Sequence, residues 1–74
     1  MLTIDARGHR CPVPTLKLQK ALAEASPGDA VRLIADDPMA RIDVPHFASG
    51  AGHEVVSTQD QASGAVAFTV RKRA

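Results

Sequence analysis

The chain has 74 residues, a formal net charge of +1, and a composition that is 45% hydrophobic and 23% charged. This length allows one small domain, 1–74, and excludes a second, and the composition is that of a folded chain, not a disordered one. A charge so close to neutral disfavours nucleic acid or an anionic membrane surface as the principal partner.

The first predicted strand covers residues 2–6. Leu2, Ile4 and Ala6 occupy alternate positions, which is the period of a half-buried strand. Gly8 follows directly, and a glycine can take a positive φ without steric cost. We therefore expect a tight turn that leads the chain from this strand into a helix.

A helix is predicted over residues 12–25. Its apolar residues share one face at helical spacing, namely Pro14, Leu18, Ala21, Leu22 and Ala25. Leu16 does not share that face, so we expect it to be exposed, either as an ordinary surface leucine or as a contact near the preceding loop. The segment 26–29, Ser-Pro-Gly-Asp, is a turn signal that ends the helix.

The next segment, 30–35, is a second predicted strand. Val31, Leu33 and Ala35 fall on one side of it, and Arg32 and Ile34 fall on the other. A strand, a helix and a strand within about 35 residues form a βαβ unit, whose two strands are expected to be parallel.

A second helix is predicted to end near Ala51. Proline in a helix interior costs about 3 kcal/mol, and Pro45 lies within the helical pattern. We therefore expect a separate short turn over 39–42, followed by a helix that Asp43 caps and that has Pro45 in its first turn. Gly50 and Gly52 are the expected C-terminal signal.

Two more strands are predicted near residues 53–58 and 66–71, joined by the polar loop 59–64 as a hairpin. The predicted order is β-α-β-α-β-β. The expected fold is an α+β two-layer sandwich, in which a four-stranded mixed sheet is covered on one face by two helices.

The only cysteine lies at the junction of the first loop and the first helix. Proline is favoured in a helical first turn, so Pro12 and Pro14 predict that Cys11 is the N-cap. A sulfur at that position faces free main-chain N–H groups, here those of Val13 and Thr15, and the positive end of the helix dipole. Both features favour the thiolate.

An inert buried cysteine is the alternative, because that is the commonest fate of a lone cysteine. The flanking cations Arg7, Arg10 and Lys17 favour the reactive interpretation, although a solvated surface explains them equally well. Asp36 and Asp37 follow the second strand, whose carboxyl end lies beside that of the first. These two carboxylates either orient the loop 7–10 that leads to Cys11, which we call the cysteine loop, or cap the second helix.

The cysteine content also indicates a compartment. Cys11 cannot form an intramolecular disulfide, whereas small secreted domains usually need several. The chain reaches Asp5 too early for a signal peptide, and no apolar run approaches a membrane span. We expect a cytoplasmic protein without a membrane partner. We expect no cofactor and no metal, since only His9 and Cys11 have zinc-ligand spacing.

Several segments together resemble the TusA/SirA family of small sulfur-carrier proteins. They are Asp5-Ala6-Arg7-Gly8, Cys11-Pro12-Val13-Pro14, Pro27-Gly28-Asp29, Ala35-Asp36-Asp37-Pro38, Asp43-Val44-Pro45 and Gly52-His53-Glu54. The resemblance covers nearly the whole chain and implies the same two-layer fold. It departs at His9, where the family usually has a hydrophobic residue, and an exposed loop histidine explains that position at least as well as a functional one.

The resemblance implies that Cys11 carries sulfane sulfur as a persulfide, with Arg10, Pro12, Pro14, Asp36 and Asp37 in supporting positions. The protein would then be a sulfurtransferase or a protein sulfur carrier. Its implied donor is a cysteine desulfurase or a rhodanese-type protein, and its implied acceptor is a thiol-bearing protein. The family serves tRNA thiolation, cofactor synthesis and sulfur oxidation.

The alternative function is a small RNA-binding or regulatory module without sulfur chemistry. The basic tail Arg71-Lys72-Arg73 is compatible with it. Phe47 and Phe68 are the only aromatic residues, however, and base stacking usually requires more. We therefore expect no direct binding of nucleic acid. A thiol redox protein is a third alternative, weakened by the lack of a second cysteine to resolve an oxidised one.

Overall fold

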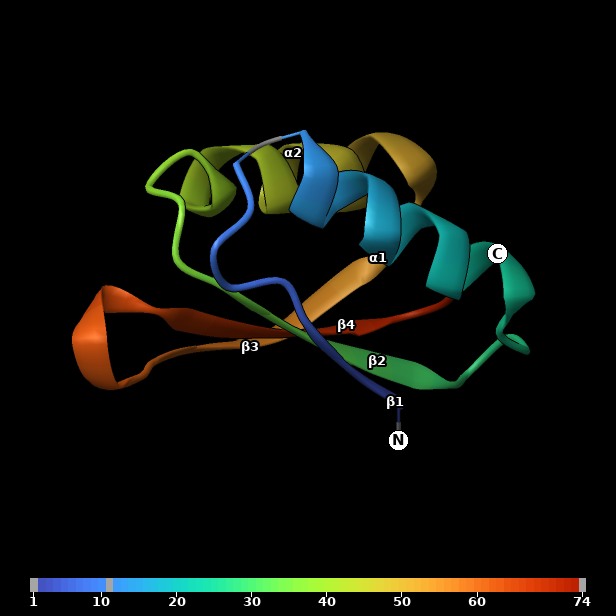
Figure 1. Cartoon of the computed structure of the whole chain (residues 1–74). Helices are drawn as coiled ribbons and strands as arrows, with labels where there is room; N and C mark the ends of the chain where they lie inside the picture. Colours follow the sequence, from blue (N-terminus) through green and yellow to red (C-terminus); the bar gives the residue numbers. More distant parts are fainter. Residues whose placement is uncertain (1, 11, 74) are drawn as a thin grey trace.

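Two layers form the fold: a four-stranded sheet and a pair of helices on one of its faces (Figure 1). The computed structural model describes residues 2–10 and 12–73. Their elements follow the predicted order, with β1 (Leu2–Asp5), α1 (Val13–Glu24), β2 (Ala30–Ala35), α2 (Ala40–Ala51), β3 (Glu54–Asp60), a 3₁₀ turn η1 (Ala62–Gly64) and β4 (Val66–Arg71).

The sheet has the strand order β1-β2-β4-β3 and is mixed. β1 pairs in parallel with β2, whereas β4 pairs antiparallel with both β2 and β3. The parallel βαβ unit and the hairpin are therefore confirmed. β3 runs on to Asp60 and so takes two residues that the sequence placed in the loop, and a bulge between Val55 and Ser57 interrupts its register.

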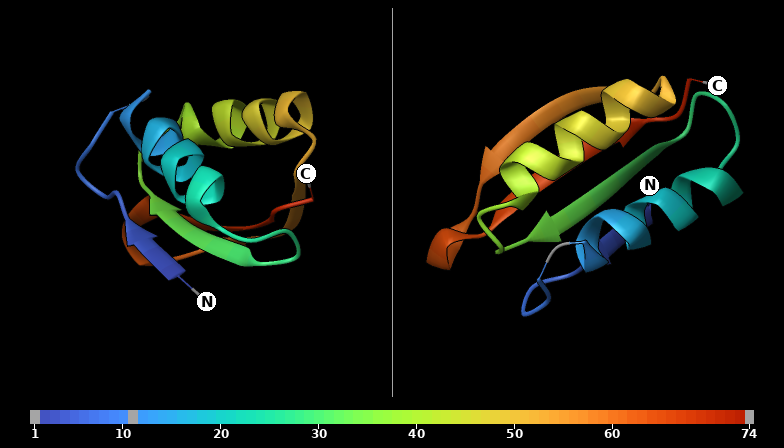
Figure 2. Two further views of the ribbon diagram at one scale, coloured as in Figure 1. Left: turned by 90° about the vertical axis from the view of Figure 1, so that its right-hand side faces the viewer. Right: turned by 90° about the horizontal axis from the view of Figure 1, so that it is seen from above.

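The core lies between the helices and the sheet face that they cover. The left view of Figure 2 shows both helices on this one side of the sheet. The largest fully buried side chains are Phe68, Leu18, Leu22, Leu33, Val31, Val44, Val66, Val70 and Pro14. The predicted alternation in β2 is confirmed, because Val31, Leu33 and Ala35 are all buried. The uncovered sheet face carries the half-buried side chains of Arg32 and Ile34 on this strand.

α1 buries the face that the sequence predicts. Pro14, Leu18, Ala21 and Leu22 are buried, whereas Leu16 is 56% exposed. The helix begins at Val13, and its N-cap is Pro12, one residue later than expected.

α2 corrects the expectation of two separate helical segments. It is continuous from Ala40 to Ala51 with Pro45 inside it, and Asp43 lies in its first turn instead of capping it. The end is as expected, since Gly52 adopts a left-handed conformation with φ 80° as the C-cap. Neither helix formed by the described residues is long and apolar enough to cross a membrane.

Candidate functional site

The carboxyl ends of β1 and β2 place the cysteine loop beside the segment 36–38. Their parallel pairing brings these ends to the same edge of the sheet. The main-chain N–H of Ala6 donates a hydrogen bond to the carbonyl of Ile34 at 2.8 Å, which extends the pairing one residue beyond β1. The sequence prediction that the two loops are neighbours is confirmed.

A tight turn then redirects the chain. The N–H of His9 donates to the carbonyl of Ala6 at 3.2 Å, and Gly8 has a φ of 86°. A residue with a Cβ is strained at that φ, which explains the glycine. The turn lifts the chain from the sheet layer toward the helix layer, where α1 begins (Figure 1).

Asp5 and Arg7 form a local ion pair before this turn. The guanidinium of Arg7 donates from Nη2 to Oδ2 of Asp5 at 2.6 Å and from Nε to Oδ1 at 2.9 Å. These hydrogen bonds, reinforced by the N–H of Arg7, lower the pKa of Asp5 from 3.8 to about 2. The guanidinium of Arg7 is thus paired with Asp5. This pairing disfavours a role for Arg7 beside the Cys11 thiolate.

Asp36 and Asp37 have different partners. The carboxylate of Asp36 accepts the N–H of Gly8 at 3.0 Å and so joins the segment after β2 to the cysteine loop. Oδ1 of Asp37 accepts the N–H of Met39 at 3.0 Å, and the carbonyl of Asp37 accepts the N–H of Ala40. Asp36 therefore holds the cysteine loop, while Asp37 organises the start of α2.

A pocket of about 270 Å³ lies between these two segments. Its lining consists of Gly8, His9, Arg10, Asp36, Asp37 and Pro38. Three of the predicted supporting residues, Arg10, Asp36 and Asp37, are therefore brought together. Arg10 is exposed and forms no ion pair with the described residues. Within the described residues, the pocket combines the unpaired guanidinium of Arg10 with the carboxylates of Asp36 and Asp37, which accept main-chain N–H groups.

The first turn of α1 corrects the expected set of free N–H donors. The N–H of Val13 donates to the carbonyl of Arg10 at 2.9 Å, so this group is already occupied. The N–H of Leu16 donates to the carbonyl of Pro12 at 2.9 Å and begins the helical ladder. Pro12 is exposed, whereas Pro14 is buried in the core. Pro14 thus anchors the start of α1 against the sheet.

Cys11 lies outside the described residues, so its thiolate character stays a prediction. Its expected position as the N-cap is wrong, because the N-cap of α1 is Pro12. The residues on either side are placed. Arg10 lines the pocket, and Pro12 caps α1. Of the predicted supporting residues, Arg10, Asp36 and Asp37 line one pocket, whereas Pro12 and Pro14 form the start of α1.

Thr15 is a polar residue that sequence reasoning considered only for its main-chain N–H. Its Oγ1 atom is buried and has no hydrogen-bond partner among residues 2–10 and 12–73. A buried hydroxyl without a partner is costly in an apolar environment. The available sequence signal was a threonine beside the predicted apolar face of α1, four residues after Cys11.

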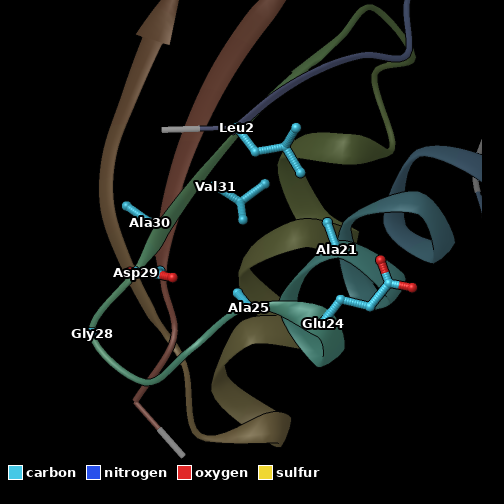
Figure 3. Close-up of a pocket in the computed structure, with 8 residues that line it drawn as sticks. All are labelled: Leu2, Ala21, Glu24, Ala25, Gly28, Asp29, Ala30 and Val31. Carbon is cyan, nitrogen blue, oxygen red and sulfur yellow. The ribbon is translucent and has the colours of Figure 1, made fainter.

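A larger pocket, of about 520 Å³, lies at the other end of α1 (Figure 3). Figure 3 shows Ala21 and Glu24 of α1 on one side of it and Leu2, Ala30 and Val31 from the strands on the other. The eight lining residues include the carboxylates of Glu24 and Asp29 but no serine, threonine, histidine or cation. The described residues hold no group of three His, Cys, Asp or Glu side chains arranged for a metal ion. The smaller pocket, and not the larger one, is lined by residues that were expected to support Cys11.

The sequence profile of the family described as "Sulfurtransferase TusA" matches residues 2–72. A "Sulfur carrier protein TusA" from Pseudomonas entomophila (strain L48) is 39% identical over 72 residues, which cover 97% of this chain and 89% of that protein. The protein of the same name from Pseudomonas aeruginosa (strain LESB58) is 38% identical over 71 residues, with coverage of 96% and 89%.

A solved structure has the same fold. The crystal structure of the SirA-like protein from Desulfitobacterium hafniense superimposes with a TM-score of 0.88 at 31% sequence identity and covers all of both chains. The predicted two-layer fold and the predicted family resemblance are both confirmed.

Proposed function

Because the chain belongs to the TusA sulfurtransferase family, we propose that it is a sulfur carrier that takes up sulfane sulfur on Cys11 as a persulfide. The proposal is carried by the segment Cys-Pro-Val-Pro at residues 11–14, which joins the loop held by Asp36 to the start of α1. Cys11 is the only cysteine, so the chain contains no other thiol that could carry sulfur.

The proposed reaction has two exchanges. The Cys11 thiolate attacks the outer sulfur of a donor persulfide, the donor's inner thiolate leaves, and a persulfide forms on Cys11. An acceptor thiolate then attacks the outer sulfur of that persulfide, and the Cys11 thiolate is released. One sulfane sulfur moves from donor to acceptor, and neither exchange requires an external oxidant or reductant.

A single thiol therefore acts as nucleophile in the first exchange and as leaving group in the second. A moderately lowered pKa suits both steps, because leaving improves as the pKa falls while nucleophilicity declines only in part. With one cysteine, the chain cannot resolve its own persulfide as an internal disulfide. The sulfur must pass to another molecule.

The donor in this proposal is a cysteine desulfurase or a rhodanese-type protein, and the acceptor is a thiol-bearing protein. The acceptor decides whether the sulfur serves tRNA thiolation, cofactor synthesis or sulfur oxidation. A persulfide relay of this kind requires a reducing compartment such as the cytoplasm, where free thiols persist.

The basic tail favours this function over nucleic-acid binding. Arg71 and Arg73 both pair with Glu54, at 3.5 and 3.1 Å, and Nζ of Lys72 donates to the carbonyl of Ala25 at 2.8 Å. All three cations are thus engaged within the domain. Phe68 is buried in the core and offers no stacking surface.

Intact mass spectrometry tests the proposal. The wild type and the Cys11→Ser variant are each incubated with glutathione persulfide and then with a reductant. We expect the wild type alone to gain the mass of one sulfur atom and to lose it on reduction. A wild type whose thiol reacts with iodoacetamide but gains no sulfur would contradict the proposal.

A further inference from the structure

Exposed apolar side chains gather at the amino-terminal ends of both helices. Val13 and Leu16 of α1 are 38% and 56% exposed, and Met39 and Ile42 at the start of α2 are 48% and 62% exposed. Among the described residues, only Leu2 and Val56 are comparably large and exposed. A gathering of this kind on a small soluble domain marks an interaction surface.

Helical geometry places these side chains on the outer surface of the helix layer. Leu16 lies opposite the face of α1 that carries Leu18, and Ile42 lies opposite the face of α2 that carries Val44. α1 and α2 run side by side on the same face of the sheet, with their amino-terminal ends on the same side of the molecule (Figure 2). Both ends adjoin the pocket between the cysteine loop and Pro38.

Unpaired cations border this surface on the α1 side. Arg10, Lys17 and Lys20 are exposed and form no ion pair with the described residues. Lys20 is one helical turn from Leu16, and Lys17 is one turn from Val13, so each lysine neighbours an exposed apolar side chain. The first acidic residue of α1 is Glu24, at its last position.

The α2 side has a different charge pattern. Arg41 pairs with Asp60, so its charge is neutralised locally. The nearby carboxylates of Asp36 and Asp37 accept main-chain N–H groups of Gly8 and Met39. The surface is therefore positive along α1, whereas its α2 side contains carboxylates that accept main-chain hydrogen bonds. The two sides of the surface thus differ in charge.

We propose that Val13, Leu16, Met39 and Ile42 form an apolar docking surface for the protein that exchanges sulfur with Cys11. The partner has an apolar anchor, with carboxylates on the side that meets Arg10, Lys17 and Lys20. This inference rests on the proposed function, because sulfur exchange requires the partner's sulfur to reach Cys11. The apolar centre provides affinity, and the cations along α1 steer and orient the partner.

A second copy of this chain is a poorer match for the same surface. A two-fold symmetric contact in which the α1 sides of two copies meet would place two sets of Arg10, Lys17 and Lys20 against each other, and like charges there are unfavourable. An acidic partner complements these cations instead. The charge pattern thus selects a different protein.

The test compares a protein donor with a small donor. The wild type and the double variant Leu16→Asp, Ile42→Asp are charged either by a purified cysteine desulfurase supplied with cysteine or by glutathione persulfide. We expect kcat/KM with the desulfurase to fall at least tenfold, mainly through KM. Charging by glutathione persulfide is expected to stay within twofold, since that donor needs no docking surface.

Val56→Asp is the matched control, because Val56 is 44% exposed but lies on the edge strand β3. It introduces the same type of charge as the two substitutions in the double variant, and it should leave the rates of charging by both donors unchanged. Circular dichroism of each variant checks that the fold is retained. Charging by the desulfurase that is equal in the double variant and in Val56→Asp would overturn the docking surface.

The cations are tested separately. The wild-type rate of charging by the desulfurase is expected to fall as salt is added. In the double variant Lys17→Glu, Lys20→Glu, we expect slower charging and a rate that no longer falls with added salt. Arg32→Glu, on the uncovered sheet face, is the control and should retain that dependence. A wild-type rate that does not respond to salt would refute the steering role of α1.

The outcomes separate this inference from the proposed function. A wild type that glutathione persulfide cannot charge contradicts the carrier function itself. A wild type that accepts sulfur from glutathione persulfide but from neither a cysteine desulfurase nor a rhodanese-type protein contradicts only the docking surface. Concentration-dependent dimerisation that Leu16→Asp, Ile42→Asp abolishes would identify a second copy as the occupant and would also contradict it.

Discussion

Two adjacent carboxylates illustrate how residues of one type acquire different roles. From the sequence, Asp36 and Asp37 were equally suited to orient the cysteine loop or to cap the second helix. In the structure, Asp36 accepts the N–H of Gly8, 28 positions earlier in the chain, and Asp37 accepts the N–H of Met39 two positions later. The loop contact depends on the parallel pairing of β1 with β2, which the βαβ pattern predicted. Which of the two carboxylates accepts the N–H of Gly8 became clear only from the structure.

Removal of the Asp36 carboxylate is expected to slow persulfide formation on Cys11. An exposed hydrogen bond contributes about 0.5–1.5 kcal/mol, which corresponds to a roughly two- to tenfold lower rate in Asp36→Ala. Asp36→Asn keeps an acceptor oxygen and should recover most of the rate. The measurement is the rate of sulfur uptake from glutathione persulfide.

Asp29 provides the matched control, because its carboxylate also accepts a main-chain N–H, that of Ser26, but at the far end of α1. Asp29→Ala should leave the rate of sulfur uptake unchanged. Equal slowing in Asp29→Ala and Asp36→Ala would show that Asp36 acts through general stability and not through the cysteine loop.

The pair of Asp5 and Arg7 predicts a pH dependence at the residue scale. The folded-state pKa of Asp5 is lowered to about 2 by its hydrogen bonds to Arg7, so the pair stabilises the protein above the ordinary value of 3.8. That contribution is lost as the pH falls through about 2. Carboxyl NMR titration should show the low pKa in the wild type and a higher pKa in Arg7→Ala, in which only the main-chain N–H of residue 7 still donates to Asp5. An unchanged pKa in Arg7→Ala would refute the ion pair.

In α2, the burial of side chains in the core outweighs the low helix propensity of Pro45. Ala40, Val44 and Ala48 are all buried at a spacing of four residues, and only a continuous helix places them on one face. Pro45 lies on the exposed side, so its ring does not enter the core. Its missing N–H would have donated to the carbonyl of Arg41, an exposed residue that water can reach.

Pro45→Ala is therefore expected to stabilise the protein. The variant supplies the missing N–H donor and removes the clash of the proline ring with the preceding turn. Part of this gain is offset, because the unfolded chain has more conformational entropy without proline. The net gain should be about 1–2 kcal/mol, and each kcal/mol raises Tm by roughly 4–8 °C for a domain of this size. Thermal unfolding followed by circular dichroism measures it.

Ser49→Ala is the control for Pro45→Ala, because Ser49 is also exposed within α2. It changes helix propensity alone, so it should raise stability by no more than a few tenths of a kcal/mol. A lower Tm in Pro45→Ala than in the wild type would mean that the proline fits this helix without strain.

At the scale of the whole molecule, stability depends on one thin core between a sheet and two helices. Phe68 lies on β4, which pairs with strands on both sides, and its side chain is 1% exposed. Phe47 packs at the edge of the core, against His53 with 6.0 Å between the ring centres. The two aromatic residues therefore differ greatly in what their removal would cost.

Phe68→Ala is expected to destabilise the domain by about 3–5 kcal/mol. A chain of this length is stable by only roughly 4–11 kcal/mol, so much or all of its stability would be lost. Phe47→Ala should cost clearly less, because its neighbours can relax into the edge of the core. Urea unfolding at 25 °C measures both variants, and equal losses would contradict the central position of Phe68.

The element order, the core-facing residues and the family resemblance could all be predicted from the sequence. These predictions follow from local rules, since the spacing of apolar residues indicates the buried face and the prolines at positions 12 and 14 indicate where α1 begins. The tertiary structure decided that Val13 is not a free donor, that Arg7 is committed to Asp5, and that Pro45 lies within a continuous helix. It also brought the exposed apolar ends of α1 and α2 to one side of the molecule. The contacts of Arg7 and Val13 join residues two and three positions apart, so they depend on the conformation that the folded loop adopts. The continuous helix and the common side of the two helix ends depend on packing between groups that are distant in the sequence, because a buried face is decided by its partner as well as by its own residue.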